Sequence, residues 1–343
     1  MKRDAGEADG DLSDAAQSSP PLRKRPAAET EAELLPPSDM VETSNSSPNR
    51  NPSPLLGDPD YEWSCFADED PMQQSSAVPE DEAAKKPLIG DKELLSALAA
   101  EYQSGSPILL EKIKLLGEQY VALRRARGDG NCFFRCFMFS YLEHILETQD
   151  KAEVDRITAK VEECKTTLQN LGYADFTFED FFSVFLEQLE NVSRGNDTPV
   201  SHEVLVEVSR DQSTSDYVVM FFRFVTAGEI QRRAEFFEPF IVGLSSATVS
   251  QFCKTSVEPM GEESDHVHII ALSDALGVPI RVIYLDRSSC DTGSLKVNHH
   301  DFIPASDGHK EISQSSGSDI GDLSKPYITL LYRPGHYDIL YPK

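Results

Sequence analysis

The chain lacks any hydrophobic run approaching the roughly 20 apolar residues that span a bilayer. No short apolar core of a secretory signal peptide follows Met1. Basic residues are also scarce: 32 Lys and Arg stand against 58 Asp and Glu, for a net charge of −26. So acidic a chain repels phosphate groups through its overall field. We therefore expect no membrane span and no nucleic-acid partner, and a partner with a basic face suits this charge better.

Paired cysteines are missing as well. The six cysteines form no CxxC pair and no evenly spaced framework; they are Cys65, Cys132, Cys136, Cys164, Cys253 and Cys290. This favours reduced thiols and a cytoplasmic location, with the nucleus as a further compartment. The histidines of His266–His268 and His299–His300 lack the Cys/His/carboxylate spacing of a zinc site. We expect no metal and no cofactor.

Apolar residues make up 39% of the chain, a little low for a wholly globular protein. The deficit falls at the N-terminal end, where residues 1–90 hold 12 of the 21 prolines and 19 acidic residues against 8 basic ones. Such a segment cannot bury enough apolar surface to offset the entropy of ordering its backbone. We predict that residues 1–86 are a disordered, acidic, Pro/Ser-rich extension and that residues 87–343 form the folded domain.

Two features of this extension have open interpretations. The basic run Arg23–Pro26 is either a nuclear import signal or a chance cluster, since four-residue basic runs are common. The patch Tyr61–Phe66 carries the only Trp among acidic residues, and it is either a docking segment or a stretch that binds nothing.

Periodicity predicts the elements of the folded domain. Expected helices cover 91–102 with Asp91 as N-cap, 108–120, 132–146, 152–171, 181–192, 198–244 with breaks near Asp211 and Gly228, and 265–276 with Ser264 as N-cap. Ser215 is a further candidate N-cap, for the apolar run 217–224. Expected strands cover 278–285, the region around 302–303, 327–332 and 336–341. The Ser/Gly/Asp-rich stretch 309–324 is expected to be a mobile loop.

One cysteine stands where a glycine-rich turn meets a helical pattern. The turn Arg127–Asn131 contains two glycines, and Cys132 opens the apolar helix that follows. Unpaired backbone N–H groups at a helix N-terminus favour a thiolate and can hold a developing oxyanion. A free cysteine in an aromatic-rich segment is nevertheless more often a small buried hydrophobe, so this stretch alone favours packing.

A second stretch near the C-terminus changes that balance. Two short strands flank a Pro-Gly break, and the second strand carries His336 and Asp338, two residues apart and therefore on one face. An imidazole can take the proton of a thiol, and a carboxylate can fix the tautomer of the imidazole. Taken alone, the pair is better interpreted as a histidine on a strand near a surface aspartate, with no catalytic role.

Together the two stretches form a more specific signal than either stretch alone. Asp129-Gly130-Asn131-Cys132 with His336-Tyr337-Asp338 resembles the ovarian-tumour (OTU) class of cysteine deubiquitinases, and within it the otubains. Further matching blocks lie between them in order, at Asp211–Tyr217, Val257–Met260 and Glu263–Leu272. The resemblance runs from about Leu88 to Lys343. The resemblance implies that residues 87–343 form an otubain-like catalytic domain.

The resemblance implies an α+β, papain-like fold with a helical subdomain packed on a small C-terminal β-sheet. The expected partners are ubiquitin and polyubiquitin chains, with ubiquitin-conjugating enzymes as a further candidate. The implied reaction is hydrolysis of the isopeptide bond between the C-terminal glycine of ubiquitin and a lysine.

The implied site assigns a role to each residue. Cys132 attacks the carbonyl, His336 moves the proton and Asp338 orients His336. Backbone N–H groups of Gly130, Asn131 and Cys132 are the candidates for the oxyanion hole.

The family pattern places Asp129 with the catalytic residues. A turn aspartate also shapes its loop through backbone bonds, and we favour that loop-holding role over proton transfer.

Two other functions stay open at this point. Some otubains act by binding, because they sequester a ubiquitin-charged conjugating enzyme without using their own cysteine. A Cys-His pair also serves acyltransferases, which would pass the acyl group to an amine instead of water.

Overall fold

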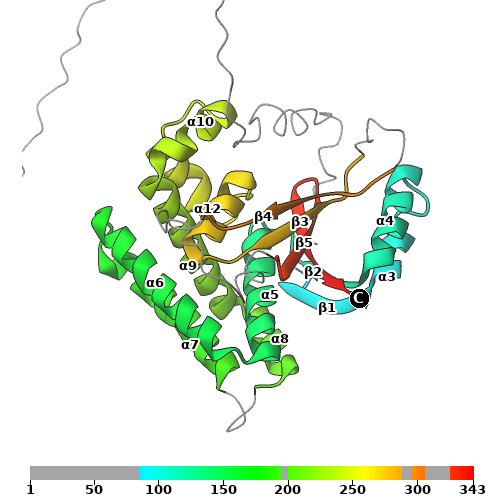
Figure 1. The fold of residues 1–343 in the computed structure, drawn as a ribbon, viewed down its shortest axis with the longest axis horizontal. Helices are drawn as coiled ribbons and strands as arrows, with labels where there is room; N and C mark the ends of the chain where they lie inside the picture. Colours follow the sequence, from blue (N-terminus) through cyan, green and yellow to red (C-terminus); the bar gives the residue numbers. More distant parts are fainter. Residues whose placement is uncertain (1–84, 195–199, 288–294, 306–324) are drawn as a thin grey trace, which may run out of the picture. The chain divides into compact units, whose positions relative to one another are not determined.

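The computed structural model describes residues 85–194, 200–287, 295–305 and 325–343 (Figure 1). The expectations for residues 1–84, including the basic run Arg23–Pro26 and the patch Tyr61–Phe66, lie outside the described residues, as does the stretch 309–324. Within the described ranges, no helix is long and apolar enough to cross a membrane.

Helices dominate the order of elements. They are α3 (Leu95–Glu101), α4 (Pro107–Gln119), α5 (Cys132–Thr148), α6 (Lys151–Asn170), α7 (Glu179–Ser193), α8 (His202–Arg210), α9 (Gln212–Arg232), α10 (Ala234–Leu244), α11 (Val249–Phe252) and α12 (His266–Leu276), with short turns η3 (Asp175–Thr177) and η5 (Cys253–Val257). The strands are β1 (Ile89–Leu94), β2 (Tyr120–Ala126), β3 (Ile280–Tyr284), β4 (Asn298–Phe302), β5 (Ile328–Arg333) and β6 (His336–Pro342). The expected α+β class is confirmed.

The six strands form one sheet in the order β1-β2-β6-β5-β3-β4. Only β3 and β5 run parallel; every other neighbouring pair is antiparallel. Strands β1 and β2 precede the helix that carries Cys132, so the sheet extends beyond the C-terminal strands expected from the sequence. Because β2 pairs with β6, the chain just before Cys132 lies beside the strand that carries His336.

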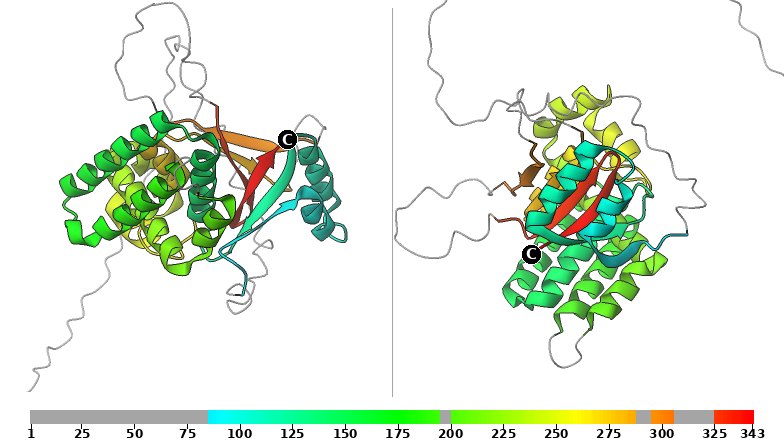
Figure 2. Two further views of the ribbon diagram at one scale, coloured as in Figure 1. Left: turned by 90° about the horizontal axis from the view of Figure 1, so that it is seen from below. Right: turned by 90° about the vertical axis from the view of Figure 1, so that its right-hand side faces the viewer.

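Each face of the sheet is covered by helices, because side chains alternate between the two faces of a strand. Leu123, Ile283, Leu331 and Leu340 point toward α3 and α4. Their neighbours Ala122, Val282, Leu330 and Ile339 point into the larger core, which includes α5. The right-hand view of Figure 2 looks through α3 and α4 onto the strands.

Two predicted N-caps, Asp91 and Ser264, are wrong. Asp91 lies inside β1, where Ile89 and Lys92 pair with β2, and α3 begins only at Leu95. The N-cap of α12 is Asp265, whose carboxylate accepts from the backbone N–H groups of Val267 and His268. A carboxylate with two acceptor oxygens displaces the neighbouring Ser264 hydroxyl from that role.

The run 198–244 also breaks differently from the prediction. The break at Asp211 is confirmed, because Asp211 caps α9 through the Thr214 N–H. Ser215 therefore lies inside α9 and is fully buried. Gly228 does not interrupt the helix, since its missing side chain leaves room for Leu168, whose nearest atom would be 3.1 Å from an added Cβ. The break falls at Arg233 instead.

Candidate active site

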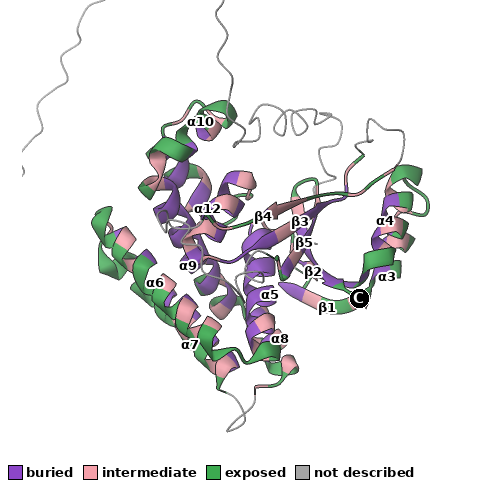
Figure 3. Cartoon of the chain, viewed as in Figure 1, coloured by how far each residue is buried: buried purple, intermediate pink, exposed green. Residues whose placement is uncertain are grey.

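The candidate nucleophile opens the buried helix α5. Cys132 is its first residue, and Asn131 at the N-cap makes no capping hydrogen bond with its side chain. The backbone N–H groups of the first helical turn therefore donate no hydrogen bond to the side chain of the N-cap residue. Figure 3 shows that α5 is buried along most of its length, so packing fixes the direction of this helix end.

Gly130 gives the turn before Cys132 its shape. Its φ is +72°, in the left-handed region that favours glycine. A Cβ added at Gly130 would lie 1.7 Å from the carbonyl oxygen of Gly261, so no other residue fits without moving the backbone. The turn is therefore held against the segment around Gly261, which is 131 residues further along the chain.

The candidate base and its carboxylate come from β6. His336 Nε2 lies 2.9 Å from Asp338 Oδ1, and the same oxygen accepts from the backbone N–H of Ala126 at 3.2 Å. Arg333 at the end of β5 donates to the second carboxylate oxygen at 2.5 Å. Asp338 is fully buried, and these three donors compensate the cost of burying its charge.

Contacts with Cys132 complete this arrangement. The second ring nitrogen of His336, Nδ1, faces the turn, because a Cβ added at Gly128 would lie 3.5 Å from it. Burial lowers the pKa of His336, but hydrogen bonds to Asp338 and Cys132 outweigh burial and raise the pKa to about 9. Burial pushes the pKa of Asp338 upward, yet the bond from His336 and the charge of Arg333 hold it below its usual value. The site thus stabilises the imidazolium form of His336 beside the carboxylate of Asp338.

Access to the site is narrow. The side chain of His336 is 20% exposed, whereas Cys132 is only 5% exposed. Little of Cys132 is therefore accessible to solvent, whereas part of the His336 ring is exposed.

Asp129 lies in the turn and is engaged on both oxygens. Oδ1 accepts from the backbone N–H of Asn131 at 3.0 Å, and Oδ2 accepts from Arg135 at 2.9 Å. These bonds are those of a turn-holding residue, whereas Asp338 is the carboxylate that contacts His336. In this arrangement the Asn131 N–H is occupied, and among the described residues the N–H groups of Gly130 and Cys132 have no protein acceptor.

Three arginines belong to the site and were not singled out from the sequence. Arg135 on α5 and Arg223 on α9 are buried, and Arg333 on β5 is half-buried. The available signal was a cation inside an apolar helical run, as in the stretches around Arg135 and Arg223. A charge at a position that periodicity predicts to be buried must find partners, but periodicity does not tell which ones.

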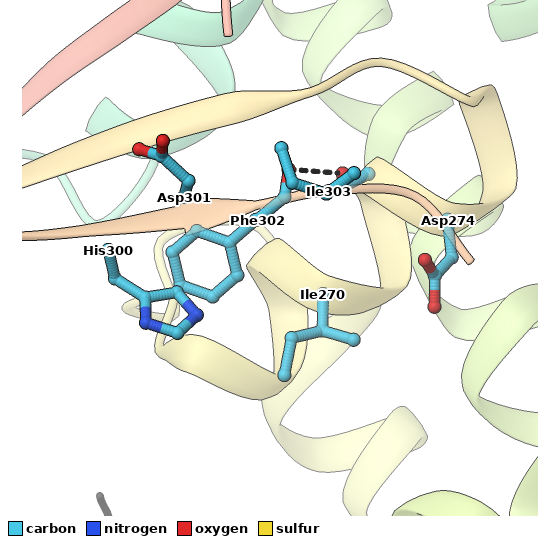
Figure 4. A pocket seen from close by; sticks show the side chains of 7 residues that line it. Ile270, Asp274, His300, Asp301, Phe302 and Ile303 are labelled. Carbon is cyan, nitrogen blue, oxygen red and sulfur yellow. Dashed lines mark hydrogen bonds between the residues drawn. The ribbon is translucent and has the colours of Figure 1, made fainter. Parts of the chain in front are cut away.

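A small cavity of about 210 Å³ lies elsewhere, between the second half of α12 and the strand β4 with the residue that follows it. Figure 4 shows Ile270 and Asp274 on one side of it and His300, Phe302 and Ile303 on the other. None of the candidate catalytic residues lines it. The Cys132–His336 pair therefore lies outside this cavity.

Comparison with known proteins gives one family. The model of peptidase C65, otubain, matches residues 81–342. The "OVARIAN TUMOR DOMAIN-containing deubiquitinating enzyme 1" of Arabidopsis thaliana is 67% identical over 283 residues, which cover 82% of this chain and 89% of that protein. The ubiquitin thioesterase OTUB1 of Homo sapiens is 40% identical over 295 residues, or 86% of this chain and 98% of that protein.

Solved structures agree. A ceOTUB1 complex with ubiquitin aldehyde and UBC13~Ub matches with a TM-score of 0.65 and 34% identity, covering 77% of this chain and 97% of that one. A h/ceOTUB1 complex with ubiquitin aldehyde and UBCH5B~Ub matches with a TM-score of 0.63 and 32% identity, covering 83% and 99%. The papain-like OTU fold expected from the sequence is confirmed.

Proposed function

The chain belongs to the peptidase C65 otubain family, and from this premise we propose that it is a thiol-dependent deubiquitinase. Its reaction is hydrolysis of the isopeptide bond between the C-terminal glycine of ubiquitin and a lysine. The observation that carries the proposal is the contact of His336 with both Cys132 and Asp338 at the N-terminus of α5. This geometry supplies a nucleophile, a proton carrier and an orienting carboxylate.

The first half of the reaction acylates Cys132. The thiolate attacks the carbonyl carbon, and the imidazolium of His336 then gives its proton to the leaving lysine amine. Asp338 holds the Nε2–H of His336, which leaves Nδ1 facing the turn that precedes Cys132. In the second half, His336 takes a proton from water, and the resulting hydroxide cleaves the thioester and frees the ubiquitin carboxylate.

The oxyanion of each tetrahedral intermediate forms beside the turn. We propose that the N–H groups of Gly130 and Cys132 bind it, since both are without protein acceptors among the described residues. The Asn131 N–H becomes a third donor only if Asp129 releases it, because Asp129 Oδ1 now accepts its proton at 3.0 Å.

The recessed sulfur supports ubiquitin as the substrate. Cys132 is only 5% exposed, so a substrate whose reacting carbonyl carries no side chain meets the least steric hindrance there. A C-terminal glycine has no side chain, and it can bring its carbonyl to the sulfur. The net charge of −26 also suits a partner with a basic face.

Cleavage of a panel of diubiquitins of every linkage tests this function. Wild type should cut at least one linkage, and Cys132→Ala should cut none. Cys164→Ala is the matched control, because Cys164 is also a buried helical cysteine but contacts Ala275 O on α12 rather than His336. Wild-type protein that cuts no linkage contradicts the proposal, and so does a Cys132→Ala variant that still cuts.

Binding of a ubiquitin-charged conjugating enzyme is the second candidate function. It is favoured by the matched otubain structures, which are complexes with UBC13~Ub and UBCH5B~Ub. If this chain has that function, Cys132→Ala should still slow ubiquitin-chain synthesis by a charged conjugating enzyme. An uncharged enzyme is the control, and equal rates with and without the variant contradict the binding role.

We also propose a cytoplasmic location, with the nucleus as a further compartment. The support is the chemistry of a thiol enzyme, which needs a reduced cysteine. Imaging of a fluorescent fusion, with and without Arg23–Arg25 replaced by alanine, tests both compartments. A secreted fusion contradicts the proposal.

A further inference from the structure

The turn that carries the candidate oxyanion donors rests on one buried arginine. Arg223 of α9 is fully buried, and its guanidinium contacts four backbone or side-chain oxygens. Nη2 donates to Gly130 O at 3.1 Å, Asn131 Oδ1 at 2.7 Å and Glu262 O at 2.7 Å, while Nη1 donates to Val257 O at 2.9 Å. No other side chain type has this planar set of donors.

These contacts join two loops that are distant in sequence. The turn 128–131 and the segment 257–262 meet at the guanidinium, and the Gly261 N–H also donates to Asn131 Oδ1 at 3.0 Å. Gly130 lies so close to Gly261 that neither loop can move far without the other. The two loops therefore form one unit whose common centre is Arg223.

The direction of these bonds matters for catalysis. Arg223 holds the Gly130 carbonyl and the Asn131 side chain on the inner side of the turn. Because a peptide unit is planar, holding Gly130 O fixes the plane of the Gly130–Asn131 peptide, and holding the Asn131 side chain restrains the Cα from which the next peptide unit runs on to the Cys132 N–H. The phenyl ring of Phe134, 4.8 Å from the guanidinium carbon, limits the movement of Arg223 itself.

A purely structural role for Arg223 is the simpler alternative. Buried arginines often only satisfy backbone carbonyls, and their loss lowers stability. The two roles differ in one respect: a structural arginine affects all properties of the site together. An arginine that aims the oxyanion donors affects the steps that form an oxyanion and spares the nucleophile.

We propose that Arg223 is a positioning residue, which locks the turn 128–131 to the segment 257–262 and so aims the oxyanion-binding N–H groups. This proposal rests on the proposed hydrolase function. The hydrogen bonds of the Arg223 guanidinium run to Val257, Gly130, Asn131 and Glu262 rather than to Cys132 or His336, so Arg223 acts through Gly130 and Asn131.

The test is Arg223→Lys, which keeps a positive charge but loses the planar fork. The matched control is Arg156→Lys, because Arg156 also donates to a backbone carbonyl, Leu276 O at 2.7 Å, but joins α6 to the end of α12. Hydrolysis is measured with ubiquitin bearing a C-terminal fluorophore. Alkylation of Cys132 by iodoacetamide is followed by mass spectrometry of its peptide, and this displacement forms no oxyanion.

The expected result separates the two reactions. Arg223→Lys should lower kcat about 10²-fold, the loss typical of one missing oxyanion donor, with KM and the alkylation rate changed by less than about threefold. Binding of ubiquitin aldehyde should weaken with kcat, because its adduct with Cys132 places an oxygen at the same position. Asn131→Ala should not add its full effect to that of Arg223→Lys, since the two residues share one bond.

Amide hydrogen exchange tests the lock without any substrate. In Arg223→Lys, exchange should accelerate at 130–132 and at 258–262 together, and the Arg156→Lys control should leave both unchanged. The proposal is overturned if kcat stays within threefold of wild type, if alkylation falls as much as kcat, or if the two loops respond separately. Wild-type protein that hydrolyses no ubiquitin substrate overturns the proposed function instead, and the exchange result still decides the lock.

Discussion

Replacing Asp338 with Asn probes the centre of the proposed mechanism. The carboxylate accepts from His336 Nε2 at 2.9 Å through one oxygen and from Arg333 at 2.5 Å through the other. An amide has the same shape but only one acceptor oxygen. Its NH₂ group must therefore meet either His336 or Arg333, donor against donor.

Both consequences have a magnitude. Asp338 is fully buried and the Arg333 side chain is 20% exposed, so the variant leaves a largely buried cation without its anion, which costs about 3 kcal/mol of stability. Activity should fall by about 10²- to 10⁴-fold, because the imidazole loses the group that fixes its tautomer. The pKa of His336, now about 9, should fall by more than about one unit, since two of the causes that raise it are removed.

Three measurements check this prediction. They are kcat/KM on ubiquitin with a C-terminal fluorophore, the NMR titration of the His336 ring and chemical denaturation. Asp301→Asn is the control, because Asp301 also pairs with an arginine in the same sheet, Arg281 at 2.6 Å, away from the site. The reasoning is refuted if Asp338→Asn keeps activity within about threefold of wild type and the His336 titration does not move.

Three further predictions follow from the site. Gly130→Ala should reduce kcat at least about 10²-fold, because its Cβ would lie 1.7 Å from Gly261 O. The control is Gly172→Ala, which is also at positive φ but in open space and should cost only about 1 kcal/mol of stability. Equal effects of the two substitutions on kcat contradict the role of the turn. Asp129→Asn should lower kcat about 10-fold or more without moving the His336 titration, since its oxygens hold the turn and a buried arginine; a shifted titration would reveal direct proton coupling. Because the pKa of His336 is raised to about 9, protonated His336 stabilises the fold by about 3 kcal/mol; this contribution is complete below pH 6.5 and is lost as the pH rises through about 9. The free energy of unfolding should therefore fall more between pH 6.5 and 9.5 in wild type than in His336→Gln. Parallel curves for the two proteins contradict this prediction.

The helical part of the fold was predictable because its signals are local. The run after Cys132 is apolar on every side, and the structure buries α5 accordingly. Asp211 was foreseen as a break and proves to be the N-cap of α9. Neighbouring caps are harder to assign, since Ser264 and Asp265 carry nearly the same signal and only the loop geometry decides between them.

Strand β2 shows why part of the sheet was missed. Its sequence contains Arg124 and Arg125, which hide the alternation of apolar residues. Arg124 is nonetheless buried, because it donates to Tyr341 OH at 3.1 Å and lies over the ring of Phe139. These partners are 217 and 15 residues away along the chain, so no window of sequence contains the reason for the burial.

The sequence by itself determined which residues we propose to react: a cysteine after a glycine-rich turn, and a histidine and an aspartate that alternation places on one side of a strand. Only the tertiary structure shows which carboxylate contacts His336 and which one is hydrogen-bonded within the turn. Asp338 receives its three hydrogen-bond donors because β6 lies between β2 and β5, whereas Asp129 accepts a hydrogen bond from Arg135 of α5. Strand pairing and helix packing bring together groups that are up to about two hundred residues apart, and no local pattern records such distances.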